Sequence, residues 1–284
     1  MKRLKEKRTA GFLIILFVYV VAALVGIMVF RALDFQLWLS LLIADAVATV
    51  VVFIFSVIFG NASVYDPYWS VQPIFIISAF VIGKGEVTLF SVLLLICVGF
   101  WAVRLTLNWA YTFSNLEHQD WRYTMLKEKT GKFYPLINFI GIHMVPTVVV
   151  YFCVLPAVYA VCDKMSANAG SILFLVISFF AAVMQGISDI QMHKFRKTRT
   201  SPFIRTGFWK YSRHPNYLGE ILMWWGVGLS VVSSSGNAVY LIGAILNTVL
   251  FLCVSIPMAD ARQSRKEGFS EYKMQTRMLL PIKK

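Results

Sequence analysis

Charged residues are scarce in this chain of 284 residues. Only 14% are Asp, Glu, Lys or Arg, whereas a typical soluble domain has about 25%. Hydrophobic residues instead make up 58% of the chain. Most of this chain therefore does not need to face water, and the composition predicts an integral membrane protein rather than a soluble domain.

Several familiar site signatures are also absent from the sequence. No two of the four cysteines have the CxxC spacing, which argues against a zinc site or a redox pair. There is no HExxH motif and the four histidines are scattered, so we expect no metal site. No GxGxxG or GxxxxGK[ST] run occurs, which argues against a Rossmann or P-loop nucleotide site.

The net charge of +13 is of the kind that nucleic-acid-binding proteins carry. Here, however, the basic residues lie between apolar runs and at both ends of the chain. Basic residues beside membrane spans are usually a topology signal. We therefore predict membrane lipids as partners and no nucleic acid.

Apolar runs of spanning length recur along the chain. A helix needs about 20 apolar residues to cross a bilayer, and six runs meet that need: 11–31, 37–60, 87–113, 136–161, 169–193 and 238–258. Two shorter runs, 72–83 and 216–232, are tilted spans or re-entrant segments. The first run could also be a signal peptide, but it is longer than the 7–15 residues typical of one, and we interpret it as a retained span. These runs predict an all-α, polytopic membrane helical bundle with seven to eight transmembrane helices.

The positions of the basic residues test this assignment of membrane spans. With the N-terminus inside and eight crossings, the inner side receives the N-terminal tail, the loops 114–134 and 194–215, and the C-terminal tail, which together hold nearly all Lys and Arg. The outer side receives only Arg31, Lys84 and Lys164. The positive-inside rule then predicts that both termini are cytoplasmic.

Some polar residues lie where a membrane span does not need them. Four share one helical face near the end of the fifth long run: Gln185, Asp189, His193 and Arg196. A charge at the centre of a span costs about 2.5–3.5 kcal/mol, so we favour a function for Asp189, whereas Arg196 also fits a side chain that extends to the interface. Arg104 and Asn108 form a second pair at i, i+4, with a headgroup anchor as the alternative interpretation of Arg104.

The stretch 212–220 is the most specific signal in the chain. Pro215 suits the first turn of a helix, and a helix N-terminus attracts anions. Asn216 and Glu220 face the same way on that helix, and Gly219 permits close approach. Nearby basic residues add to the positive charge: Arg205, Lys210 and Arg213. The stretch predicts a phosphate or nucleotide site at the membrane surface, and the alternative is a positive-inside loop that ends at a proline.

Several motifs together resemble a known family. They are Ser212–Glu220 followed by Met223–Gly226, then Asp66–Ser70, Trp101–Leu105 and Gln119–Tyr123. Over roughly residues 40–284 the chain resembles the steroid 5-alpha-reductase-like membrane proteins, and more closely their bacterial relatives, the DUF1295 family. The resemblance implies an added transmembrane helix over 1–36 and a reductase-like membrane domain over 37–284.

The resemblance also implies an activity. It suggests an NADPH-dependent oxidoreductase that reduces a C=C bond in a steroid-, isoprenoid- or lipid-like molecule taken from the bilayer. The implied location is the bacterial cytoplasmic membrane, with the cofactor site on the cytoplasmic side. The sequence lacks the Gln-Glu pair of the steroid enzymes, and Trp101 stands near their expected tyrosine.

The candidate acids are three polar residues that lie at or near the expected cytoplasmic ends of spans: Asp66, Tyr68 and Tyr111. The candidate cofactor-binding residues lie on the same expected side: Arg104, Asn108, Asp120, Arg122, Gln185, Asp189, His193, Arg196, Arg205, Arg213, His214, Asn216, Tyr217, Glu220 and Arg265.

Two alternatives to the reductase remain open. The pattern Arg213-His-Pro-x-Tyr-x-Gly219 is also shared with isoprenylcysteine and phospholipid methyltransferases, which use S-adenosylmethionine. Those enzymes have a Glu-Glu pair after the last span, where this chain reads Ala259-Asp-Ala-Arg262. The other alternative is an inactive membrane protein that binds lipid.

Overall fold

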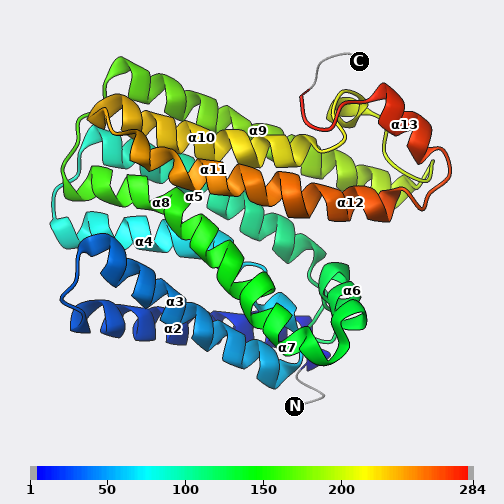
Figure 1. Ribbon diagram of the computed structural model, residues 1–284, viewed down its shortest axis with the longest axis horizontal. Helices are drawn as coiled ribbons and strands as arrows, with labels where there is room; N and C mark the ends of the chain where they lie inside the picture. The colour runs from blue at the N-terminus through cyan, green and yellow to red at the C-terminus, as the bar shows by residue number, and fades with distance from the viewer. Residues whose placement is uncertain (1–4, 281–284) are drawn as a thin grey trace. The chain divides into compact units, whose positions relative to one another are not determined.

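The chain is almost entirely helical in the computed structural model, which describes residues 5–280 (Figure 1). Within that range there is no β-strand, and one isolated parallel bridge joins Ser212 to Arg277. The α-helices are α2 (Arg8–Ala32), α3 (Leu37–Phe59), α4 (Tyr68–Lys84), α5 (Leu89–Thr112), α6 (Trp121–Thr130), α7 (Tyr134–Ile137), α8 (Val145–Cys162), α9 (Ala169–Thr198), α10 (Pro215–Ser235), α11 (Ile242–Leu250), α12 (Ile256–Gln263) and α13 (Phe269–Gln275). Short 3₁₀ segments are η1 (Ala62–Val64), η2 (Gly131–Phe133), η4 (Gly207–Lys210) and η5 (Ala238–Leu241), and π-helical segments are η3 (Asn138–Met144) and η6 (Phe251–Ser255).

Six helical stretches are long and apolar enough to cross a membrane: Arg8–Ala32, Leu37–Phe59, Leu89–Thr112, Trp121–Cys162, Ala169–Thr198 and Ala238–Gln263. They coincide with the six long apolar runs of the sequence, so the predicted class of multi-pass helical membrane protein is confirmed. The two short runs form α4, with 17 residues, and α10, with 21 residues. The count of eight crossings and the side of the termini stay predictions.

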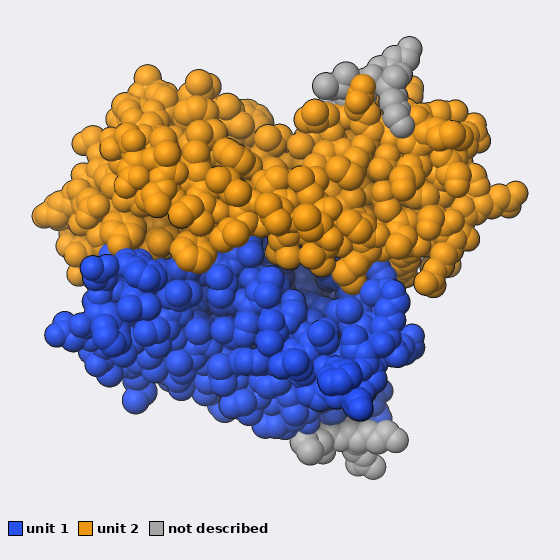
Figure 2. All heavy atoms as spheres, viewed as in Figure 1, with its two compact units in different colours: residues 1–75, 105–151 blue, residues 76–104, 152–284 orange. Residues whose placement is uncertain are grey.

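The described helices divide into two compact units, which Figure 2 shows in two colours. Unit 1 comprises residues 1–75 and 105–151, and unit 2 comprises residues 76–104 and 152–284. The predicted division into an added helix over 1–36 and a domain over 37–284 stays a prediction.

Unit 1 contains a buried loop between α3 and α4. α3 ends at Gly60, which adopts the left-handed conformation with φ of 61°, and residues 61–65 are then buried. The Tyr19 hydroxyl donates a hydrogen bond of 2.8 Å to the Val64 carbonyl, about 17 Å from the first residue of α2 at 1.5 Å per residue. The loop therefore turns back beside the middle of α2, which is tolerated because irregular backbone can be buried within the protein.

Unit 2 is organised by the close pairing of α9 and α10 (Figure 1). A Cβ atom at Gly226 would lie 2.6 Å from the Ser178 Cβ and 2.7 Å from the Phe174 carbonyl oxygen. A Cβ at Gly219 would lie 2.7 Å from the Ala181 carbonyl oxygen. Small residues let membrane helices approach in this way, and the contact brings the polar residues of the two helices together.

We expect Gly226→Ala to lower the thermal stability of the protein in detergent. The added methyl group forces α9 and α10 apart, and overpacking of this kind costs about 1–3 kcal/mol. Gly83→Ala is the matched control, since a Cβ at Gly83 meets nothing within 4 Å. Equal melting temperatures for the two variants would contradict the close pairing.

Candidate functional site

Four of the predicted polar residues form one network in unit 2. Arg104 of α5 donates to Asp189 of α9 at 2.7 Å and to the Gln185 Oε1 at 2.5 Å. The Gln185 amide then donates to the Glu220 carboxylate of α10 at 2.7 Å. Three helices therefore meet through a continuous set of hydrogen bonds, one of which is the Arg104–Asp189 ion pair.

Glu220 is the most completely bound member of this network. Its Oε2 also accepts the Trp101 indole N–H at 2.8 Å, and its Oε1 accepts the Trp224 indole N–H at 2.9 Å. The residue is only 5% exposed, so three N–H donors stabilise a carboxylate that would otherwise be very costly to bury. Glu220 therefore positions Gln185 and holds α5, α9 and α10 together.

Unit 2 also contains buried polar atoms that no described residue satisfies. Three of them are the Arg104 Nε, the Arg213 Nε and the Asn216 Oδ1, none of which has a hydrogen-bond partner within residues 5–280. Buried polar groups in proteins are nearly always paired. Two nitrogen donors and an amide oxygen are suitable partners for the phosphate and amide groups of a nucleotide, so these residues fit such a ligand.

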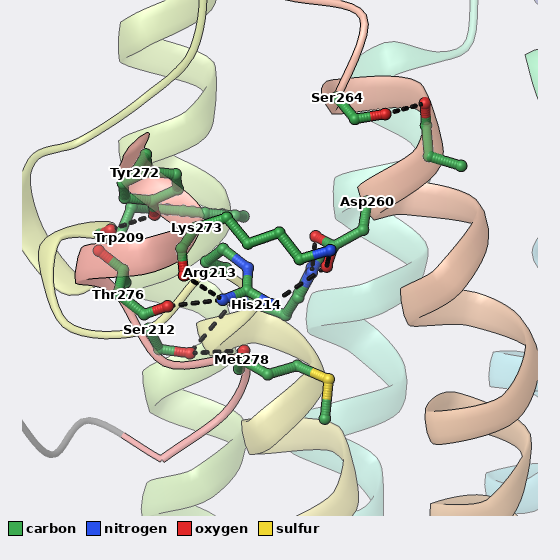
Figure 3. Close-up of polar contacts among 11 residues, drawn as sticks. Trp209, Ser212, Arg213, His214, Asp260, Ser264, Tyr272, Lys273, Thr276 and Met278 are labelled. Atoms are coloured by element: carbon green, nitrogen blue, oxygen red, sulfur yellow. Dashed lines mark hydrogen bonds and ion pairs between the residues drawn. The ribbon is translucent and has the colours of Figure 1, made fainter. Parts of the chain in front are cut away.

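A second polar cluster surrounds the start of α10 (Figure 3). Asp260 of α12 contacts the Arg213 guanidinium at 3.1 Å and the His214 Nε2 at 2.9 Å, and Lys273 of α13 points to the same carboxylate, 4.0 Å away. Arg213 also donates to the Thr276 carbonyl at 2.5 Å. Arg213 and His214 therefore tie the loop before α10 to α12, and Arg213 ties it also to the C-terminal segment.

The C-terminal segment covers the loop between α9 and α10. The Tyr272 hydroxyl donates to the Trp209 carbonyl, and burial raises the pKa of Tyr272 to about 12. Arg205 donates to the Gly268 carbonyl at 3.2 Å and lies over the Phe203 ring, 4.5 Å from its centroid. Arg205 therefore contributes to this contact as well as to the local positive charge.

Exposed basic side chains form a rim at the end of unit 2 that contains the loop between α9 and α10. They are Lys194, Arg196, Lys197, Arg199, Arg205, Lys210, Arg262, Arg265 and Lys266. Partial burial and the charges of Arg262 and Arg196 lower the pKa of Lys266, which indicates that these cations act on one another. His193 is half-buried. A group of like charges of this kind favours a multiply charged anion.

A pocket of about 300 Å³ lies beside this rim, lined by Met184, Phe208, Tyr211, Ser212, Pro215 and Leu218. It is bounded by α9, η4 and the first turn of α10, and most of its lining is apolar. Tyr217 does not line it; the Tyr217 ring stacks on His214 with centroids 5.3 Å apart. The pocket is near the lower size limit for small-molecule sites.

The other predicted residues lie in unit 1. Asp66 accepts the Tyr123 hydroxyl at 2.5 Å, and burial raises the pKa of Asp66 to about 6, even though the charge of Arg122 acts to lower it. Asp120 caps α6 and pairs with Arg122 at 2.7 Å.

Two of the three remaining members of the predicted set lie near the end of α5 (Leu89–Thr112). Tyr111 is 56% exposed there, and Asn108 is half-buried. Tyr68, the first residue of α4, hydrogen-bonds at 3.3 Å to Asp45 rather than to Asp66.

Four residues that complete these clusters are not predicted as site residues from the sequence: Asp45, Trp101, Trp224 and Asp260. For Trp101 the sequence indicates only that it occupies the position near the tyrosine of the steroid enzymes. Asp45 could have been found, because an ionisable residue inside an apolar run of spanning length is a functional candidate by default. The two tryptophans resembled residues of the membrane-interface belt. Only the fold shows that their N–H groups point at Glu220.

The helices and the polar networks between them define an integral, multi-pass membrane protein. The family model described as "Protein of unknown function (DUF1295)" matches residues 52–276, so the chain belongs to that family. An uncharacterized protein of Schizosaccharomyces pombe, C594.04c, is 26% identical over 148 residues, which cover 44% of this chain and 43% of that protein. The chain therefore matches less than half the length of this relative. No solved structure matches the chain.

The raised pKa of Asp66 predicts a pH dependence of stability. Its pKa is 3.8 in the unfolded chain and about 6 in the folded one, so the folded protein binds this proton more tightly. The contribution of Asp66 to the free energy of unfolding is fully present below pH 4 and is lost as the pH rises towards 6. The loss is about 1.4 kcal/mol for each unit by which the two pKa values differ. We expect Asp66→Asn to abolish this loss.

Chemical denaturation of the two proteins at pH 4 and pH 6.5 measures the difference. Asn keeps an oxygen that can accept the Tyr123 hydroxyl, so the variant retains the local contact. A parallel pH dependence in both proteins would show that Asp66 is not the titrating group.

Proposed function

We propose that this protein is an NADPH-dependent reductase of a C=C bond in a steroid-, isoprenoid- or lipid-like molecule. The observation that carries the proposal is the network of Arg104, Gln185, Asp189 and Glu220 inside three apolar helices. Ionisable residues within spans are expensive and are typical of functional sites. The resemblance of the same segments to the steroid 5-alpha-reductase-like proteins supports this interpretation.

The basic rim of unit 2 supports a dinucleotide with an extra phosphate. NADPH carries a pyrophosphate and a 2′-phosphate, and we assign their binding to Arg196, Arg205 and Arg265. The nearby unpaired Asn216 Oδ1 would accept an N–H from the ligand. This assignment places the cofactor at the end of unit 2 that the positive-inside rule makes cytoplasmic, in a bacterial cytoplasmic membrane.

NADPH would supply the hydride, because no protein side chain can do so. The chain's own residues would bind, orient and protonate. Arg104 and Asp189 would orient a polar group of the ligand, and Glu220 would keep Gln185 in place. One acid would polarise the carbonyl conjugated to the C=C bond, and the candidates are Asp66, Tyr68 and Tyr111.

Thermal stabilisation of the purified protein by added ligands tests the proposal. We expect NADPH to raise the melting temperature, since a ligand at 100 times its dissociation constant adds about 2.7 kcal/mol. Asp189→Ala and Arg196→Ala should each abolish the shift. Lys164→Ala is the matched control, because Lys164 pairs with Glu86 at the opposite end of unit 2.

Other ligands in the same assay separate the alternatives. Stabilisation by S-adenosylmethionine and not by NADPH would identify a methyltransferase and contradict the reductase. No response to NADPH, NADP, NADH or S-adenosylmethionine would favour an inactive lipid-binding protein. An unchanged NADPH shift in both alanine variants would reject the assigned site.

A further inference from the structure

The apolar pocket of unit 2 lies outside the polar network around Glu220. It has a volume of about 300 Å³ and is bounded by α9, η4 and the first turn of α10. Leu218 of α10 lines the pocket, whereas Asn216 and Glu220 do not. Residues two positions apart on an α-helix point about 200° apart, so Leu218 faces away from both. The pocket is therefore on the opposite face of α10 from the network.

The side of the pocket that α9 forms belongs to the outward face of that helix. Met184 lines the pocket, and Phe180 and Ile187 lie on the same side of α9, at i−4 and i+3. Both of these apolar side chains are exposed. Gln185, by contrast, is buried and donates to α10. Because α9 is long and apolar enough to cross a membrane, its exposed apolar face contacts lipid, and the pocket adjoins the hydrocarbon of the bilayer.

The segment η4 is fixed against α9 by hydrogen bonds. The Phe208 N–H donates to the Gln191 Oε1 at 3.0 Å, and the Trp209 indole N–H donates to the Ser188 carbonyl at 3.2 Å. Gly207 permits this contact, since its φ is 62° and a Cβ there would lie 2.4 Å from the Gln191 side chain. The side of the pocket that η4 forms is therefore a fixed part of the fold.

Two lysines carry positive charge beside the pocket, near the C-terminal end of α9. Tyr211 lines the pocket and is 51% exposed, and the Lys210 ammonium lies 5.7 Å from the centroid of its ring. Lys194 is exposed on α9, three residues beyond Gln191. Neither lysine forms an ion pair within residues 5–280. The edge of the pocket therefore favours an anion, while its interior favours an apolar chain.

We propose that this pocket binds an acyl chain of an anionic phospholipid of the bilayer, with the lipid phosphate beside Lys194 and Lys210. Basic pockets between membrane helices are suited to anionic lipid headgroups, and a partly exposed tyrosine such as Tyr211 is typical of the membrane–water interface. The mostly apolar lining suits an acyl chain better than a nucleotide. The lipid site is separate from the proposed cofactor site, because Asn216 faces the other way on α10.

A lipid in the pocket stabilises the segment between α9 and α10. Its chain contacts Phe208 and Tyr211 of that segment together with Met184 of α9 and Leu218 of α10, all of which line the pocket. A ligand that binds only the folded protein raises its stability. An anionic phospholipid should therefore raise the melting temperature of the protein as well as bind to it.

Native mass spectrometry of the full chain in detergent tests the proposal. The protein is titrated with phosphatidylglycerol or with phosphatidylcholine of the same acyl chains, and we expect one phosphatidylglycerol to bind more tightly than phosphatidylcholine. Lys194→Gln and Lys210→Gln should each weaken phosphatidylglycerol binding about five-fold, the effect of one basic residue on an anionic lipid. Lys266→Gln is the matched control, because Lys266 is an exposed cation between α12 and α13, and it should leave the affinity unchanged.

A variant that fills the pocket tests its apolar part. Met184→Trp places a large ring in the pocket and keeps both lysines, so it should abolish the tightly bound lipid and the rise in melting temperature that the lipid causes. Leu173→Trp is the matched control, because Leu173 is exposed on the same side of α9, about 17 Å from Met184 at 1.5 Å per residue. It should bind phosphatidylglycerol as the unmodified protein does.

Three results would overturn the lipid site. The first is equal affinity for the two phospholipids, and the second is the same phosphatidylglycerol affinity in Met184→Trp as in Leu173→Trp. The third is displacement of bound phosphatidylglycerol by NADPH or by inorganic phosphate, which would assign the pocket to a soluble anion. Retention of the lipid in the presence of NADPH supports a separate site, and the titration with phospholipid alone gives its result whether or not the protein is a reductase.

Discussion

Inside a bundle of membrane helices a polar side chain has no water to bind, so it must find its partners within the protein. This constraint explains two of the polar clusters of the described helices. Glu220 is surrounded by N–H donors from α5, α9 and α10, and Asp45 is held by donors from α4. These contacts join neighbouring helices within each unit.

The carboxylates of Glu220 and Asp45 are satisfied by different kinds of partner. Glu220 uses both of its oxygens within the protein, and the adjacent Arg104 forms an ion pair with Asp189, so one cation lies beside two carboxylates. Asp45 forms no ion pair in the described chain and accepts hydrogen bonds from Tyr68 and Gln72. The first arrangement suits a fixed frame beside a charged ligand.

Much of this organisation could be predicted from the sequence because hydrophobic run length reports spans directly. The six long runs and the one-face spacing of Gln185 and Asp189 identified the helices and part of the network. The sequence could not show that Glu220 binds Trp101, because the residues are 119 positions apart and a tryptophan in a span resembles an interface residue. It also could not show that Tyr68 meets Asp45, because the loop that turns back beside α2 has no apolar signature.

Hydride transfer from the cofactor to a lipid tests the central claim most directly. The protein would be incubated with NADPH carrying deuterium at the transferable position and with the total lipid extract of the source cells, followed by mass spectrometry. The account predicts a lipid that gains one carbon-bound deuterium and one proton from water while losing one C=C bond. An extract in which no lipid gains deuterium, or in which S-adenosylmethionine instead yields a methylated lipid, would contradict it.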